Sequence, residues 1–197
     1  MDYTLYHAAN ELTIDFPWIG RGLGVLESWS VLVLAIATLA LWLFARPGSS
    51  RKWKLACASA LASSGLALLI NQLVARIWDR ARPFVHHPSV HVWGPRSHDP
   101  SFPSDHASAA FGIAFAVFFF DRVVGSIFLA AACVIGVGRV FIGAHYPMDV
   151  VAGCLVGFGS AVLVARLSRP VIERIVRLVE RVTDPLVASL WRLWPSR

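Results

Sequence analysis

Charged residues are scarce in this 197-residue chain. They make up 15% of it, while 56% of the residues are hydrophobic and the mean hydropathy is +0.61; a typical soluble domain has about 25% charged residues. The three cysteines, Cys57, Cys133 and Cys154, lie inside apolar segments, and an odd number in such places forms no disulfide framework. The composition therefore excludes a soluble globular domain and a disordered tail, and it indicates a polytopic membrane protein.

The chain also lacks the pattern of a nucleic-acid-binding protein. It carries 18 Lys and Arg against 12 Asp and Glu, a formal net charge of +6. These basic residues are not interleaved with polar residues of the kind that contact bases. They cluster at the ends of apolar runs and in a C-terminal segment, as topology signals and membrane-surface contacts do. We expect membrane lipids, and no nucleic acid, as partners.

Uninterrupted apolar stretches predict five membrane-spanning helices. Their predicted bounds are 26–45, 53–77, 104–120, 124–142 and 148–167. The preceding segment, 3–24, is amphipathic, and we expect it to be interrupted at Pro17 and by Gly20, Gly22 and Gly24 and to lie on the membrane surface. The predicted fold class is an all-α membrane protein, a five-span helical bundle that forms one domain over residues 1–197.

The segment 169–194 predicts an amphipathic helix at the membrane interface. Its apolar residues recur at helical spacing opposite three arginines: Val171, Ile172, Ile175, Val176, Val179 and Val182 against Arg174, Arg177 and Arg181. This pattern is typical of interfacial helices, and Trp191 and Trp194 suit the headgroup layer. We interpret the segment as an anchor without a catalytic role.

The short loops indicate the orientation of the bundle. The loop after the first span is strongly basic, with Arg46, Arg51, Lys52 and Lys54. Helix parity places Arg122 and the arginine-rich C-terminal helix on the same side, whereas the N-terminal segment has Arg21 as its only Lys or Arg. The positive-inside bias therefore predicts a cytoplasmic C-terminus and an outer N-terminal segment.

Three polar segments interrupt the apolar pattern, and helix parity brings all three to the outer face. They are 76–83, 102–107 and 138–149. Ionisable groups at membrane depth are costly, so a group of them indicates function.

The polar segments supply the parts of an anion site. Ser104, Asp105 and His106 begin a predicted helix, whose first backbone N–H groups and positive dipole end attract an anion. Arg82 and Arg139 come from different helices and can hold the same anion with planar, bidentate guanidinium groups. Together these residues predict a phosphate site.

Two histidines and a carboxylate add catalytic chemistry. His145 and Asp149 are four residues apart at the start of the last span, so the carboxylate can accept from one ring nitrogen and leave the other free as a nucleophile. His106, from a different span, is then available to protonate the departing oxygen. The outer loop holds four more histidines, His86, His87, His91 and His98. Their spacing lacks the tight ligand pairs of a zinc site, so we expect no metal.

The three segments resemble the three-part signature of the type 2 phosphatidic acid phosphatase superfamily, the membrane lipid phosphate phosphatases related to vanadium haloperoxidases. The signature reads Lys-x6-Arg-Pro, Pro-Ser-Gly-His and Ser-Arg-x5-His-x3-Asp, and the resemblance covers about residues 70–160. It implies the following roles: His145 as nucleophile, Asp149 as its orienting carboxylate, His106 as general acid, and Arg82, Ser104 and Arg139 as phosphate ligands.

The sequence departs from this signature at three positions. Ala75 replaces the lysine, which leaves Arg76, one position further round the helix, as the candidate substitute. Asp105 replaces the glycine; its N–H can still bind phosphate, but its carboxylate must point away or pair with an arginine. Gly138 stands where serine is common. The chain looks most like the bacterial undecaprenyl-diphosphate phosphatases of this superfamily.

This resemblance implies dephosphorylation of undecaprenyl diphosphate to undecaprenyl phosphate and inorganic phosphate. The reaction would pass through a phosphohistidine at the outer face of a bacterial cytoplasmic membrane, and fixed cations would make a metal or other cofactor unnecessary. Two alternatives stay open: a glycerolipid phosphatase acting on phosphatidate or phosphatidylglycerophosphate, and a transporter or binding protein for lipid phosphates. The set of His106, His145 and Asp149 favours catalysis, because binding alone does not need an oriented nucleophile.

Overall fold

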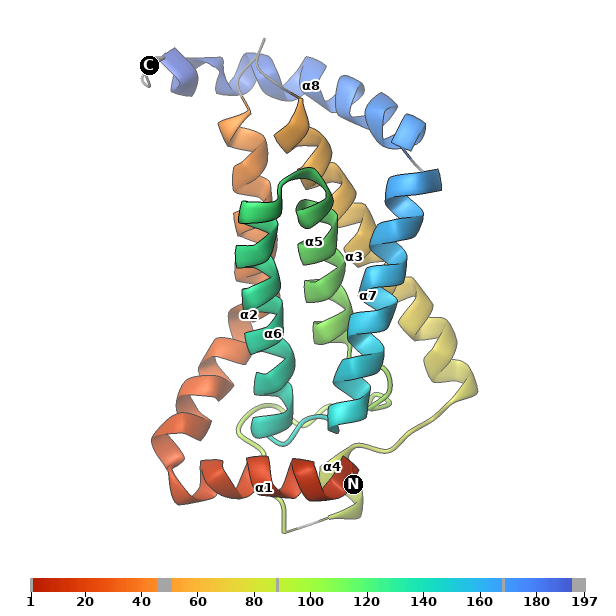
Figure 1. Cartoon of the computed structure of the whole chain (residues 1–197). Helices are drawn as coiled ribbons and strands as arrows, with labels where there is room; N and C mark the ends of the chain where they lie inside the picture. The colour runs from red at the N-terminus through yellow and green to blue at the C-terminus, as the bar shows by residue number, and fades with distance from the viewer. Residues whose placement is uncertain (1, 46–50, 88, 168, 193–197) are drawn as a thin grey trace.

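The computed structural model of the protein describes residues 2–45, 51–87, 89–167 and 169–192. All regular structure in this part of the chain is helical (Figure 1). In chain order the helices are α1 (Asp2–Asp15), α2 (Pro17–Phe44), α3 (Lys52–Ile77), α4 (Pro83–His86), α5 (Asp105–Phe120), α6 (Arg122–Phe141), α7 (Pro147–Leu167) and α8 (Arg169–Arg192). The predicted all-α fold class is confirmed.

The helices α2, α3, α6 and α7 surround α5 (Figure 1). These four are long and apolar enough to cross a membrane. Helix α5 has 16 residues, which corresponds to a rise of about 24 Å, less than the roughly 30 Å of a bilayer core. It packs against α3, α6 and α7, and Ala107, Ala110 and Ala114 on it are fully buried. The shortest of these helices therefore forms the centre of the core.

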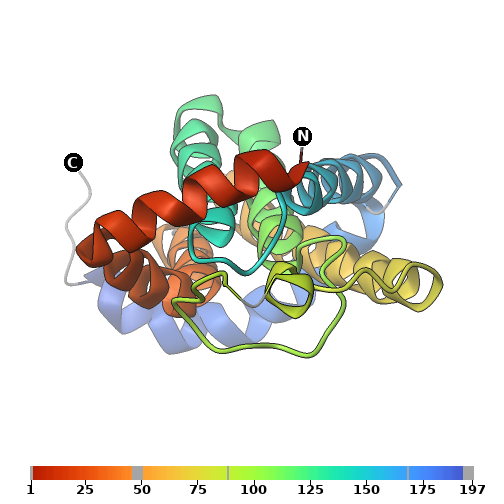
Figure 2. The ribbon, with the colours of Figure 1, turned by 90° about the horizontal axis from the view of Figure 1, so that it is seen from below.

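Helix α1 lies across one end of the bundle and α8 across the other (Figure 1). Seen from below in Figure 2, α1 runs from α2 over α6 toward α7, and it packs on all three. The break predicted at Pro17 is present, because α1 ends at Asp15 and Pro17 occupies the first turn of α2. Proline suits the first turn of a helix, because a backbone N–H at that position would have no carbonyl partner within the helix.

The predicted break at the three following glycines is wrong, and residues 17–24 belong to α2. Two of these glycines, Gly20 and Gly24, instead make room for Trp93 of the long loop between α4 and α5. A Cβ on Gly20 would lie 2.2 Å from Trp93 Cε2, and one on Gly24 would lie 2.1 Å from the Trp93 carbonyl oxygen. Trp93 Nε1 also donates to Thr13 Oγ1 at 2.8 Å. The glycines therefore allow the loop to pack against α1 and α2.

Helix α8 is joined to the bundle by ion pairs as well as by apolar contacts. Lys54 on α3 is buried, and its Nζ lies 2.7 Å from Asp184 Oδ1 and 3.3 Å from Glu180 Oε1. Ile172 and Val176 pack into the bundle, while other apolar residues of the predicted face are exposed. The side chain of Trp191, all of Trp194 and Arg46 of the basic loop lie outside the described residues.

Two glycines on α7 bring that helix close to α5. A Cβ on Gly153 would lie 2.9 Å from the Ser104 carbonyl oxygen, and one on Gly157 would lie 2.7 Å from the Gly112 backbone nitrogen. Small residues at such spacing let helix backbones approach closely. This contact places the start of α7 beside the start of α5, where the polar residues lie.

This packing predicts that position 157 requires glycine. Because a Cβ there would meet the backbone of α5, we expect Gly157→Ala to lower the free energy of unfolding by about 1–3 kcal/mol. Gly159→Ala on the same helix is the matched control, since its Cβ would meet no atom within 4 Å, and it should be neutral or slightly stabilising. Thermal unfolding in detergent micelles measures both variants. Equal melting temperatures would contradict the proposed role of this contact.

Candidate active site

Asp149 is a fully buried carboxylate in the first turn of α7. Its Oδ2 accepts hydrogen bonds from Ser101 Oγ at 2.5 Å and from the Tyr146 backbone N–H at 2.9 Å. Its Oδ1 accepts from Arg80 Nη1 at 2.6 Å. Both oxygens therefore have strong donors, which is the condition under which a carboxylate is kept inside a protein.

Arg80 connects this carboxylate to helix α1. Its Nη2 donates to Asp2 Oδ2 at 2.6 Å, and its guanidinium lies over the Tyr146 ring, with Cζ 4.2 Å from the ring centroid. Asp2 Oδ1 also accepts from the Met148 N–H at 3.1 Å. Burial acts to lower the pKa of Arg80, but the carboxylates of Asp2 and Asp149 outweigh it and raise that pKa. Helix α1 is thus held over the start of α7.

His145 lies in the turn between α6 and α7 and is 1% exposed. Its Nδ1 is 2.8 Å from the Ser101 carbonyl oxygen, and its Nε2 is 3.1 Å from Arg82 Nη1. Arginine can only donate, so Nε2 is the acceptor and Nδ1 carries the ring proton, which it donates to Ser101. Nε2 therefore keeps the lone pair that a nucleophile needs.

The contact between His145 and Asp149 differs from the expected one. Asp149 Oδ2 lies 3.7 Å from Nδ1, too far for a hydrogen bond. Ser101 lies between them, because its hydroxyl donates to the carboxylate and its carbonyl accepts the ring proton. The prediction that the carboxylate accepts directly from the ring is therefore wrong in this structure, although the two groups are neighbours.

The protein environment keeps the His145 imidazole neutral. Burial lowers its pKa to about 4, and the charges of Arg139 and Arg82 act in the same direction, against the carboxylate of Asp149. A neutral imidazole is the form that can attack an electrophile.

The two predicted phosphate-binding arginines approach His145 from different segments. Arg82 Nε donates to the Asp99 carbonyl at 2.9 Å, and burial lowers the pKa of Arg82. The backbone carbonyl of Arg139 accepts from the Ala144 and His145 N–H groups at 3.1 and 3.2 Å, which fixes the distance between Arg139 and His145 along the turn. Both guanidinium groups are largely buried, as an anion site requires.

Only some of the backbone N–H groups in the first turn of α5 are free to bind an anion. The Ser104 N–H, one of the expected phosphate donors, donates to the Asp149 carbonyl at 3.0 Å in this structure. The close approach of α7 at Gly153 brings the two groups together. The Ser104 hydroxyl is buried and has no hydrogen-bond partner among the described residues. The N–H groups of Asp105 and His106 have no carbonyl partner within their own helix, as in any first turn.

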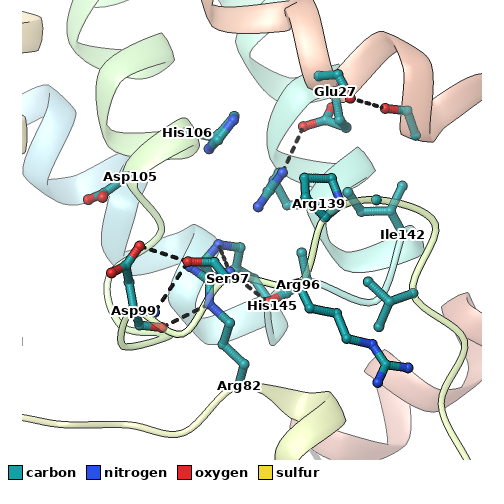
Figure 3. Close-up of a pocket in the computed structure, with 16 residues that line it drawn as sticks. Glu27, Arg82, Arg96, Ser97, Asp99, Asp105, His106, Arg139, Ile142 and His145 are labelled. Atoms are coloured by element: carbon teal, nitrogen blue, oxygen red, sulfur yellow. Dashed lines mark hydrogen bonds and ion pairs between the residues drawn. The ribbon is translucent and has the colours of Figure 1, made fainter.

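The Asp105 carboxylate is turned away from the arginines (Figure 3). Its Oδ1 accepts from Asn71 Nδ2 on α3 at 2.7 Å, and Asn71 Nδ2 is also 2.9 Å from Ser108 Oγ. This partner accounts for an acidic residue at the position where the family signature has glycine.

A cavity of about 330 Å³ brings these groups together between α2, α5, α6 and the loop between α4 and α5 (Figure 3). Arg82, Arg139, His106 and His145 line it, together with Glu27 of α2. The volume lies in the range of small-ligand sites. With Asp105, which also lines it, five of the predicted site residues therefore meet in one cavity.

Other predicted features lie away from this cavity. Arg76 is exposed on α3 and does not line it, so the structure does not bring this candidate substitute for the missing lysine together with the other predicted site residues. One position along a helix turns a side chain by about 100°, which is enough to direct Arg76 outward. In the loop after α4, the His87 ring packs against Tyr3 and the His91 ring against Trp93, both in tilted arrangements. Among the described residues no group of three or more His, Cys, Asp and Glu could hold a metal ion.

Three residues of the site were not singled out from the sequence. Ser101 and Arg80 lie in irregular segments, and their contacts with Asp149 depend on a chain path that no periodicity encodes. Glu27 did carry a signal, because it is the only acidic residue in the first apolar span, and ionisable groups at membrane depth indicate function.

A buried neutral histidine facing two arginines at one end of a membrane helix bundle is an arrangement suited to binding a phosphate group. The chain belongs to the PAP2 superfamily, whose profile matches residues 53–172. Undecaprenyl-diphosphatase BcrC of Bacillus subtilis (strain 168) is 30% identical over 189 residues, which cover 94% of this chain and 95% of that protein. The chain is therefore an integral membrane phosphatase, a hydrolase of phosphate esters or anhydrides.

Two solved structures share the fold. The crystal structure of Aquifex aeolicus LpxE matches with a TM-score of 0.63 and 23% identity, over 82% of this chain and 92% of that one. The structure of a PAP2-type phosphatidylglycerolphosphate phosphatase from Bacillus subtilis matches with a TM-score of 0.63 and 21% identity, over 86% and 85%. The arrangement of the helices is thus that of other membrane phosphatases.

The buried imidazole predicts a pH-dependent stability. In the unfolded chain His145 takes up a proton below about pH 6.5, whereas in the folded protein it does so only near its lowered pKa of about 4. This stabilisation is complete above about pH 6.5 and is lost as the pH falls toward about 4, with a slope of about 1.4 kcal/mol per pH unit. We expect His145→Asn, which does not titrate, to lack this part of the slope when unfolding free energies are measured across that range. Parallel curves for the two proteins would contradict the assignment.

Proposed function

We propose that this protein removes the terminal phosphate from a polyprenyl diphosphate, converting undecaprenyl diphosphate to undecaprenyl phosphate and inorganic phosphate. The observation that carries the proposal is the His145 Nε2 lone pair, which lies in a cavity lined by Arg82, Arg139 and His106. The choice of lipid is supported by the similarity to the undecaprenyl-diphosphatase BcrC over nearly the whole length of both chains.

In the first half-reaction, His145 Nε2 attacks the terminal phosphorus in line with the bridging oxygen. An N–P bond forms and the P–O bond to the bridging oxygen breaks, while His106 gives a proton to that oxygen. Arg82 transfers its hydrogen bond from Nε2 to a phosphate oxygen, and Arg139 binds another. The N–H groups of Asp105 and His106 add donors at the positive end of α5. The lipid monophosphate leaves and a phosphohistidine remains.

In the second half-reaction, His106 accepts a proton from a water molecule that attacks the phosphohistidine. The N–P bond breaks, inorganic phosphate leaves, and His145 returns to its neutral form. The fixed charges of Arg82 and Arg139 stabilise the transferred group in both steps, which is the task of a metal ion in other phosphate-transferring sites.

Asp149, Ser101 and Arg80 act by positioning His145. Ser101 holds the ring proton on Nδ1, and Asp149 holds the Ser101 hydroxyl. As Nε2 gains the phosphoryl group the ring becomes positively charged, and the carboxylate 3.7 Å from Nδ1 stabilises that charge.

The topology proposed for this function has α5 as a fifth crossing. Its short length is compatible with a helix enclosed by longer ones, because its outer surface faces protein rather than lipid. The basic residues at the α8 end support an orientation in which that end lies in the cytoplasm of a bacterial cell and the cavity opens at the outer face of its inner membrane. A carrier lipid would be recycled from that face.

The assay that tests the function is phosphate release by the purified protein. We expect release from undecaprenyl diphosphate to exceed release from phosphatidate and phosphatidylglycerophosphate, and His145→Ala to abolish it. Asp149→Asn should lower the rate of phosphate release by about 10²- to 10⁴-fold without abolishing it, because it removes an orienting group and leaves the nucleophile in place. A preference for a glycerolipid would support the alternative phosphatase, and tight lipid binding without phosphate release would support a transporter. Turnover by the His145 variant would refute the nucleophile.

The orientation is tested by cysteine labelling. In a protein whose Cys57, Cys133 and Cys154 are replaced by alanine, we expect Ser89→Cys, in the exposed outer loop, to react with a membrane-impermeant maleimide in intact cells. Arg122→Cys, at the exposed turn between α5 and α6, should react only after permeabilisation. The reverse pattern would place the cavity in the cytoplasm and would rule out recycling from the outer face.

A further inference from the structure

Glu27 is the one acidic side chain of α2, and it faces the phosphate cavity (Figure 3). The residue is 1% exposed, and neither carboxyl oxygen has a hydrogen-bond partner among the described residues. The nearest cationic atom is Arg139 Nη1, 4.0 Å from Oε2. In contrast to Asp149, this buried carboxyl has no donor at hydrogen-bond distance in the part of the chain that the structure describes.

An ionised Glu27 would oppose phosphate binding. A buried carboxylate without hydrogen bonds is strongly disfavoured, and an arriving phosphate would add further negative charge to the same cavity. The charged and titratable groups of the cavity wall are Arg82, Arg96 and Asp99 from the segment between α3 and α5, Asp105 and His106 from α5, Arg139 from α6 and His145 from the turn after it. The phosphate would engage the arginines and leave Glu27 without a counter-charge.

A protonated Glu27 would have the opposite effect. A neutral carboxylic acid carries an O–H donor, and proteins keep such acids neutral at sites where they must donate to an oxyanion. An O–H of this kind beside Arg139 would supply one more hydrogen bond to a phosphate oxygen.

The structure provides space for this carboxyl at Gly138. A Cβ at that position would lie 2.5 Å from Glu27 Oε1 and 3.1 Å from its Cδ. The Glu27 carboxyl therefore occupies the space that a side chain at residue 138 would fill.

From this geometry we infer that Glu27 binds the substrate as a protonated acid, donating a hydrogen bond to a non-bridging oxygen of the phosphate held by Arg139. Substrate binding is then accompanied by retention or uptake of a proton at Glu27. The inference rests on the proposed function for its substrate, a lipid diphosphate, and it makes Glu27 a binding residue of the same site.

The test compares Glu27→Gln with Glu27→Ala over a range from about pH 5 to about pH 9. Glutamine has the same shape and a permanent N–H donor, so we expect its KM to stay near that of the wild type at neutral pH and to show no alkaline rise. Alanine removes the donor and should raise KM at least about tenfold, with a smaller effect on kcat. The KM of the wild type should rise with pH as Glu27 loses its proton. Glu173→Gln on α8, a half-buried position outside the cavity, is the matched control.

Two results would overturn the inference. If Glu27→Gln raises KM as much as Glu27→Ala does, the side chain acts as a carboxylate that orients Arg139. If the wild type and Glu27→Gln share one pH profile, Glu27 does not titrate in the binding step.

A second measurement separates this inference from the proposed function. Stabilisation by inorganic phosphate, followed by thermal unfolding of the purified variants, requires no lipid turnover. A stabilisation that declines at alkaline pH in the wild type but not in Glu27→Gln supports the role of Glu27, even if no lipid diphosphate is hydrolysed. Hydrolysis by the wild type together with identical phosphate stabilisation of all three proteins refutes that role and leaves the phosphatase function intact.

Discussion

The site depends on the buried carboxylate of Asp149. Its side chain accepts from Ser101, Tyr146 and Arg80, and its backbone carbonyl accepts from Ser104. These donors come from the segment after α3, the start of α5 and the turn before α7, so one residue fixes the relative positions of three segments that are far apart in the sequence. Removing one partner of a buried charge costs about 3–5 kcal/mol. The segments that carry the site are therefore held together by the same carboxylate that orients the proposed nucleophile.

The second constraint is the orientation of the cations before any phosphate arrives. Arg82 donates to the Asp99 and Ala144 carbonyls as well as to His145, so its guanidinium is already directed along the cavity wall. Preorganised donors of this kind stabilise a transition state without the cost of reorganisation. The same positive charges contribute to the lowered pKa of His145. The cations proposed to bind phosphate thus also favour the neutral form of the proposed nucleophile, in addition to the larger effect of its burial.

The sequence was informative where spacing and helix parity decide position. They predicted five of the residues that line the cavity: Arg82, Asp105, His106, Arg139 and His145. They could not predict Ser101 or Arg80 as partners of Asp149, because these contacts depend on the course of irregular segments. The glycines of α2 were misjudged, since the steric demand of Trp93 becomes visible only when the loop is placed against the helix. The sequence pattern predicted the individual helices, whereas the wrong predictions concern contacts between two segments.

The ion pairs of α8 show that contacts stabilising the fold extend beyond the stretch of the chain that matches the family profile. The family profile covers residues 53–172, but Lys54 inside that stretch pairs with Asp184 and Glu180 beyond it. At the opposite end of the bundle, Arg80, inside the matched stretch, pairs with Asp2, which lies on the N-terminal side of that stretch. A protein trimmed to the matched stretch would keep every signature residue and still lose acidic partners at both ends. The contacts that fix the terminal helices to the bundle thus extend beyond the stretch that carries the signature residues.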